Sequence, residues 1–288
     1  MKKSYLLVLF TLLLNSAYSQ TAEKDTSWKS GGFISINFSQ TNLSQWTAGG
    51  ETQMSLAGVA NLYKNYLKGN IDWQNTLDLG YAVVRTESVG LRKSDDKIDF
   101  TSKYSKKFSK NWLYSGLVNF KSQFSNGFAY PDDSVIVSKF MAPAYLITSI
   151  GFTWKPVDYF EVMISPATAK FTFVLDQTLA DMGAYGVAPG KTTHSEFGAY
   201  LNMRFKKDIM PNITFISRLE LFNNYTDPDK NNRQNIDVNF ENTLNMKVNK
   251  FITAMVYANV VYDANVIERT QFKEMIGVGF GYKFDKNN

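Results

Sequence analysis

His194 is the only histidine of the 288-residue chain, and Ser195 and Glu196 follow it directly. A hydrolase needs a nucleophile beside a base, so these residues are the first candidates for catalysis. The surrounding residues alternate between apolar and polar types, which is typical of a β-strand, and a strand points consecutive side chains to opposite faces. His194 and Ser195 would then point apart. The sequence favours a non-enzymatic protein, with a lipid-acting hydrolase as the less favoured alternative.

The residue types argue against metal and thiol chemistry. The chain has no cysteine and a single histidine, which excludes disulfides and thiolate sites and disfavours a histidine-based metal centre. Residues 225–232 include Asp227 and Asp229, whose oxygens suit calcium, but Asp and Asn are also ordinary turn formers. We therefore expect no metal ion, no cofactor and no catalytic residue.

Charged residues recur at every second position of runs whose other positions are apolar. In residues 67–84, for example, Leu77 belongs to an apolar set and Asp78 to a polar one. A period of two places these sets on opposite faces. The same parity predicts the following interior-facing residues: Lys68, Asp72, Asp78, Lys103, His194, Glu196, Arg204, Arg218, Glu220, Asp237 and Glu241, together with Asp99, Glu161, Lys121, Lys170, Lys247, Lys273 and Lys283. Such charges line a water-filled channel, or they pair and fill a narrow interior.

Runs of this kind predict about twelve strands with alternating connections. The strands are 31–40, 51–62, 67–84, 98–108, 112–125, 140–154, 159–175, 192–206, 212–224, 234–248, 251–262 and 271–284. Short connections at 63–66, 109–111, 155–158, 207–211 and 249–250 alternate with long ones at 41–50, 86–97, 126–139, 176–191, 226–233 and 263–270. Outer-membrane barrels have an even number of antiparallel strands, short periplasmic turns and long external loops. We predict an all-β fold: a single antiparallel up-and-down transmembrane β-barrel with both termini in the periplasm of a Gram-negative bacterium.

The N-terminus has the pattern of a cleavable secretory signal. Lys2 and Lys3 precede apolar residues 5–14 and the small residues Ala17 and Ser19. We expect a signal peptide at 1–19, a periplasmic segment at 20–30 and the barrel at 31–288. Loss of the two lysines lowers the formal net charge from +5 to +3, which is too small to indicate nucleic-acid binding.

Two local patterns refine the barrel. Aromatic residues gather beside the predicted short turns, as in a membrane-interface girdle: Tyr63, Tyr66, Phe108, Trp112, Trp154, Tyr159, Phe205, Phe251 and Phe284. Within 160–175 the apolar parity switches, and an extra residue around 166–169 would restore it, which predicts a β-bulge in that region.

Residues 277–284 alternate small or charged residues with apolar ones and end on Phe284. This pattern resembles the terminal strand by which the barrel-assembly machinery recognises its substrates. The expected partners are therefore outer-membrane lipid, that machinery during insertion and an outer-membrane protein, but no nucleic acid.

The stretch Phe38-Ser39-Gln40, with residues 43–51 reading LSQWTAGGE, resembles the opening signature of a Bacteroidota family of outer-membrane barrels of unknown function, domain of unknown function 3078. Trp73-Gln74-Asn75 is the next most similar part. The resemblance implies location and fold, and no catalytic residues. We expect a structural or accessory component of an outer-membrane complex, with a narrow channel for small solutes as the alternative.

Overall fold

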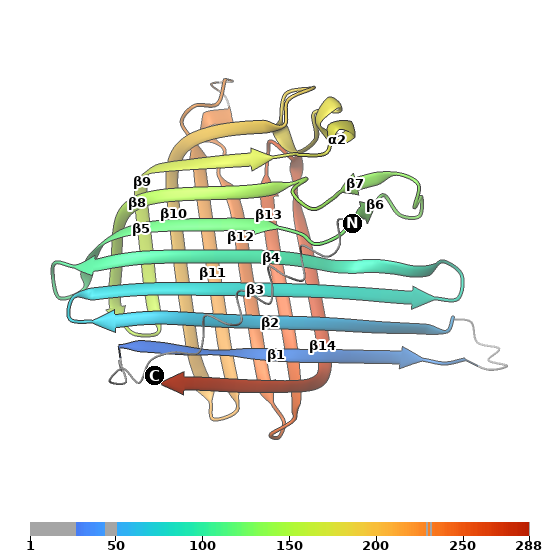
Figure 1. Cartoon of the computed structure of the whole chain (residues 1–288), viewed down its shortest axis with the longest axis horizontal. Coiled ribbons are helices and arrows are strands. Elements are labelled where there is room, and N and C mark those ends of the chain that lie inside the picture. The colour runs from blue at the N-terminus through green and yellow to red at the C-terminus, as the bar shows by residue number, and fades with distance from the viewer. Residues whose placement is uncertain (1–26, 44–50, 229, 231, 288) are drawn as a thin grey trace, which may run out of the picture.

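Twelve strands form one closed antiparallel barrel in the structure, a computed structural model that describes residues 27–43, 51–228, 230 and 232–287 (Figure 1). The barrel strands are β1 (Trp28–Thr41), β2 (Gln53–Lys68), β3 (Ile71–Thr86), β4 (Gly90–Lys107), β5 (Trp112–Ser122), β8 (Ala144–Val157), β9 (Phe160–Phe173), β10 (Thr193–Met210), β11 (Ile213–Asn224), β12 (Asp237–Lys247), β13 (Ile252–Asp263) and β14 (Ile267–Asn287). β14 pairs with β1 and closes the wall. The predicted fold class is confirmed. The expected signal peptide lies outside the described residues.

The connections contain the few remaining elements. β6 (Gly127–Phe128) and β7 (Ile136–Ser138) form a small separate sheet between β5 and β8. Helix α2 (Gln177–Asp181) and the 3₁₀ turn η1 (Ala184–Gly186) lie between β9 and β10, and the 3₁₀ turn η2 (Asn232–Gln234) lies between β11 and β12.

The connections define two rims. The short-turn rim consists of residues 69–70, 108–111, 158–159, 211–212 and 248–251, and the barrel also begins and ends there, since Lys29 pairs with Asn287. Among the described residues, the long-loop rim consists of 42–43, 51–52, 87–89, 123–143, 174–192, 225–228, 230, 232–236 and 264–266. Long connections predicted at 86–97 and 263–270 were wrong: both are tight turns between strands that extend further. Polar residues can continue a strand beyond the membrane, because only the part within hydrocarbon needs an apolar face.

Two other predicted boundaries were also wrong. β1 starts at Trp28, inside the segment expected to precede the barrel. β2 continues to Lys68, and the turn falls at Gly69 and Asn70, where Gly69 has a φ of 58°. Glycine adopts this left-handed conformation without the steric cost that other residues bear.

β9 carries a β-bulge. Ile150 of β8 pairs with Ala167, whereas Phe152 pairs with Ile164, so β9 has one extra residue at this point. The bulge includes Pro166, which has no N–H to donate to the ladder. It produces the shift in facing that the sequence predicted here.

Three glycines let the wall bend sharply. A Cβ added at Gly151, Gly198 or Gly279 would lie 2.1, 1.9 or 2.2 Å from a backbone oxygen of the neighbouring strand. Gly151 and Gly198 lie opposite the bulge region of β9. Gly279 lies where β14 passes from pairing with β13 to pairing with β1, and Figure 1 shows β14 turning a corner there. Closure of the barrel therefore depends on the absence of side chains at these places.

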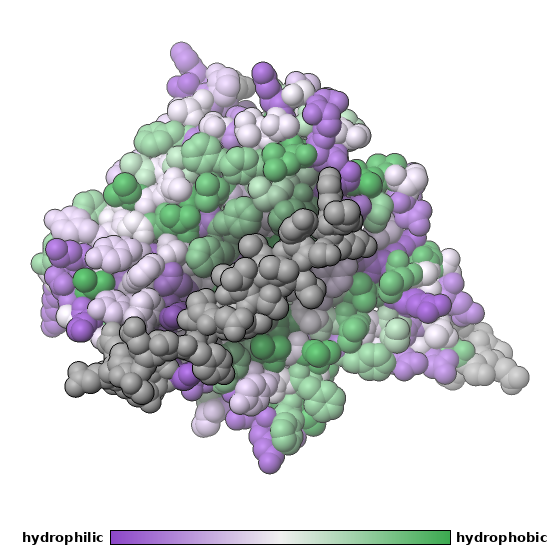
Figure 2. Space-filling model, viewed as in Figure 1, coloured by the Kyte–Doolittle hydropathy of each residue, from purple (hydrophilic) through white to green (hydrophobic). Residues whose placement is uncertain are grey.

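Apolar side chains on the outer surface are exposed. Ile150, Phe280 and Ile276 are 74%, 72% and 75% exposed. Figure 2 shows hydrophobic side chains gathered over the outside of β5, β8 and β9, with hydrophilic ones toward the rims. A closed barrel with an apolar exterior and a charged interior is the architecture of an outer-membrane protein, because every backbone polar group is bonded within the wall.

Aromatic rings line the outside of the short-turn rim. Trp28 lies 5.1 Å from Tyr66 between ring centroids, and Tyr159 lies 5.8 Å from Phe205. Tyr63 was predicted to join them but lies inside, where its hydroxyl donates to Asp285 at 2.6 Å. The reason is that β2 extends past it and places it opposite Thr76.

We expect Gly198→Ala and Gly279→Ala to impair closure of the barrel, since each methyl group would overlap a backbone oxygen. The cost should be about 1–3 kcal/mol or more. Gly116→Ala is the matched control, because its Cβ would have 3.9 Å to the nearest oxygen. The measurement is the fraction of compact, heat-modifiable protein on gels. Normal assembly of both variants would contradict the conclusion that the sharp bends of the wall require glycine.

Candidate functional site

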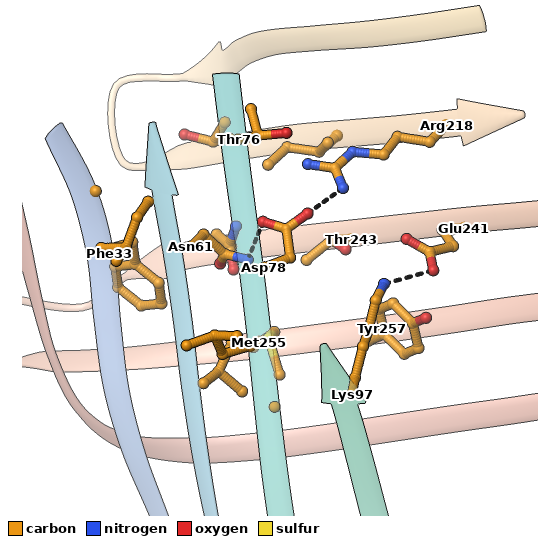
Figure 3. Close-up of a pocket in the computed structure, with 18 of the residues that line it drawn as sticks. Phe33, Asn61, Thr76, Asp78, Lys97, Arg218, Glu241, Thr243, Met255 and Tyr257 are labelled. Carbon is orange, nitrogen blue, oxygen red and sulfur yellow. Dashed lines mark hydrogen bonds and ion pairs between the residues drawn. The ribbon is translucent and has the colours of Figure 1, made fainter. Parts of the chain in front are cut away.

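Ion pairs cross the lumen and join opposite walls. Asp78 of β3 pairs with Arg218 of β11, and Lys97 of β4 lies 2.6 Å from Glu241 of β12 (Figure 3). Asn61 also donates to Asp78 at 2.9 Å. Since β3 and β4 are not neighbours of β11 and β12 in the wall, both pairs span the interior.

A second layer lies nearer the short-turn rim. Lys103 contacts Glu161 at 2.5 Å, and Lys155 contacts Asp72 at 2.8 Å. Gln74 joins the two pairs: its amide nitrogen lies 3.2 Å from an oxygen of each carboxylate. Its amide oxygen accepts a hydrogen bond from Arg204 at 3.1 Å.

A third layer lies nearer the long-loop rim and centres on Lys170 of β9. Its ammonium lies 3.2, 2.7 and 3.1 Å from Glu196, Asp237 and Asp263, which come from β10, β12 and β13. One lysine thus ties four strands together. A buried charge is stable only when it is paired and hydrogen-bonded, so these contacts hold the interior in one arrangement.

Apolar side chains fill another part of the interior. Leu117, Ile147, Met163, Tyr200 and Phe222, from β5, β8, β9, β10 and β11, form a buried cluster. Lys121 of β5 and Glu220 of β11 also pair across the interior. A cavity of about 310 Å³ remains among β1 to β4 and β10 to β14.

The two longest loops form a lid on the long-loop rim. Val174, Leu179 and Val187 pack with Ala142 of the β5–β8 connection. The hydroxyl of Tyr185 donates to the carbonyl oxygen of Val137 at 2.6 Å. At its far end, η1 contacts the β13–β14 turn: a Cβ at Gly186 would lie 3.2 Å from that of Asn265. The lid therefore reaches from β9 and β10 to the turn after β13.

Asp176 holds this lid in place. It caps α2 by accepting a hydrogen bond from the Leu179 N–H at 3.1 Å, and it contacts Lys139 at 2.5 Å. The hydrogen bond from Lys139, followed by that from Leu179, holds the pKa of Asp176 below its usual range.

The structure places most of the predicted interior residues in these layers. Contacts given above include Asp72, Asp78, Lys103, Glu196, Arg204, Arg218, Glu220, Asp237 and Glu241. His194 pairs with Thr172 and shares the face of Glu196, whereas Ser195 is exposed on the opposite face. Lys68 was placed wrongly: the turn after β2 separates it from Asp72, and it pairs with Ile71 on the other face.

Sequence reasoning missed Asp95, Lys97 and Lys155 because it assigned them to connections. Asp95 pairs with Lys273 inside the barrel. Lys97 is two residues from Asp99, and Lys155 is two residues from Thr153. The period of two therefore placed both lysines on the interior face, and the sequence contained the information needed to predict them. The strands were ended too early because their polar ends were interpreted as loops.

Part of the chain matches a known family. Residues 38–128 match the family described as Protein of unknown function (DUF3078). This match confirms the resemblance inferred from Phe38 onward. It covers the end of β1, all of β2 to β5, and β6 of the small separate sheet.

Solved outer-membrane barrels are similar in outline. An outer membrane channel from Pseudomonas putida F1 is 12% identical, with a TM-score of 0.42 over 92% of this chain and 100% of that chain. The translocator domain of the autotransporter NalP from Neisseria meningitidis is 9% identical, with a TM-score of 0.36 over 98% and 96%. The NanC porin is 11% identical, with a TM-score of 0.39 over 87% and 98%. No curated protein sequence matches the chain.

Among the described residues, no helix is long and apolar enough to cross a membrane. Across the same residues, no group of three or more His, Cys, Asp or Glu side chains could hold a metal ion.

We expect Asp78→Asn and Arg218→Gln each to destabilise the barrel, because each leaves a partner charge unpaired in the interior. The single losses should be about 1–3 kcal/mol. The double variant should lose less than their sum. Urea unfolding in lipid vesicles measures the effect, with Asp158→Asn in an exposed turn as the control. Additive losses would show that the pair does not act as a unit.

Acid should loosen the lid. The pKa of Asp176 is lower in the folded protein than in the unfolded chain, so its contribution is present above about pH 3.9 and is lost as pH falls through the folded-state pKa. Hydrogen exchange of the Leu179 and Ala180 amides should therefore quicken below that range. Asp176→Asn keeps a capping side chain but removes the charge, and its opening should not depend on pH there. An unchanged pH profile in this variant would refute the assignment.

Proposed function

We propose that this protein is a closed-lumen, non-enzymatic barrel that serves as a structural or accessory component of an outer-membrane complex. One observation supports the proposal above the others: ion pairs join non-neighbouring strands in several layers of the lumen, and two of them, Asp78 with Arg218 and Lys97 with Glu241, join opposite walls. A diffusion pore needs a continuous water-filled path, which such pairs obstruct. The lid adds a second obstruction at the long-loop rim.

The runner-up is a narrow channel for small solutes. The cavity beside β1 to β4 favours it, because part of the interior is unfilled. Conduction would require Lys97 and Glu241 to separate, since their pair lies against this cavity. A lipid-acting hydrolase has less support, as Ser195 and His194 lie on opposite faces of β10.

In planar bilayers the purified wild-type protein should show no discrete current steps. A variant lacking residues 177–187 and carrying Lys97→Ser and Glu241→Ser should show them, because it lacks the β9–β10 part of the lid and the ion pair beside the cavity. A variant with only residues 177–187 deleted should stay silent and serves as the control. Steps in the wild-type protein would replace this proposal with the channel.

The enzyme alternative has its own test. Purified wild-type protein and His194→Ala should both leave phospholipid vesicles intact. A His194-dependent lipid product would overturn the non-enzymatic proposal. Copurification from native membranes would identify the partner that an accessory role requires.

We also propose that both termini are periplasmic, since Lys29 and Asn287 lie at the short-turn rim. Epitopes inserted at Asp132 or Gly186 should be reached by antibody on intact cells, and those at Lys110 or Asn249 should not. The opposite labelling would invert the orientation.

A further inference from the structure

The cavity reaches the short-turn rim. Lys206, Lys283 and Asp285 line its outer end and are exposed. At its inner end it meets the two pairs drawn in Figure 3, Asp78 with Arg218 and Lys97 with Glu241. The cavity thus reaches the same rim as the chain ends of the barrel.

Positive charge exceeds negative charge in its lining. Six cations line it, Lys97, Arg204, Lys206, Arg218, Lys273 and Lys283, against four carboxylates, Asp78, Asp95, Glu241 and Asp285. Three of the cations have a close carboxylate partner, and Lys283 lies 3.8 Å from Asp285.

Arg204 and Lys206 remain without a carboxylate at ion-pair distance among the residues that the structure describes. Arg204 donates to the neutral Gln74, and the ammonium of Lys206 lies 5.8 Å from the centre of the Tyr63 ring. The two residues share one face of β10, and Arg204 lies directly opposite Arg218 of β11. Like charges so placed repel each other, and a bound anion would relieve the repulsion.

We infer that this pocket binds a small oxyanion, a phosphate or carboxylate on a small organic body, between Arg204 and Lys206. The planar guanidinium of arginine suits bidentate contact with such a group, and lysine adds a point charge. Phe33 and Met255 supply apolar contact for the rest of the ligand. The inference does not depend on the proposed closed lumen, because ligand binding and conduction are measured separately.

Calorimetric titration of the full-length protein in nonionic detergent tests this, with glycerol 3-phosphate as the probe and glycerol as its neutral counterpart. We expect saturable binding of the phosphate only. The double variant Arg204→Gln, Lys206→Gln should bind at least about tenfold more weakly. The control, Lys64→Gln with Lys250→Gln, removes two lysines outside the pocket and should bind normally.

A second arm distinguishes the source of the anion. Micelles containing a short-chain phosphatidylglycerol should compete with glycerol 3-phosphate if the natural ligand is a lipid headgroup, and should not if it is a free solute. Arg204→Lys keeps the charge but loses the bidentate guanidinium, so it should weaken binding less than the double variant does. This single variant replaces the double variant in the test if the latter fails to fold. No binding of either probe, or equal binding by the wild type and the pocket variants, would overturn the inference.

Discussion

The closing contact between β1 and β14 is the constraint on which the rest of this structure depends. Hydrocarbon offers no hydrogen-bonding partner, so a sheet can cross a membrane only if its last strand pairs with its first. The pairing of Lys29 with Asn287 through Asn37 with Gly279 satisfies the exposed edges of both strands. Closure also demands sharp bends, which explains glycine at positions 151, 198 and 279 and the bulge beside Pro166.

Closure creates an interior that must be filled or hydrated. This barrel fills much of it with side chains of two kinds: the apolar cluster around Met163, and charged groups that pair across the lumen. The charged groups constrain the geometry more than the apolar ones do, because an ion pair forms only when the two groups lie within a short distance of each other. Pairs such as Lys97 with Glu241 thus hold opposite walls at a set separation, at the cost of a free path for solutes.

The two ends of the barrel differ. At the long-loop rim, Lys170 faces three carboxylates, and the lid spans from β9 and β10 to Asn265. At the short-turn rim, Arg204 and Lys206 line an open pocket and lack carboxylate partners among the described residues. An interior with all its charges paired would suit a purely structural barrel. The excess of cations at the short-turn rim is what points to an anionic ligand.

The alternation of residues by itself determined the fold class, the number of barrel strands, the two faces and the bulge at Pro166. These features depend on local periodicity and on proline chemistry, which a single chain displays. It also assigned Asp78, Arg218, Glu220 and Glu241 to one face. Only the tertiary structure decided which of them meet, because the stagger and tilt of the strands determine which residues face one another across a barrel. The tertiary structure also decided the facing of Lys68 and Tyr63. The turn after β2 lies a few residues later than predicted, which places Tyr63 inside and Lys68 outside. Periodicity alone does not locate a turn.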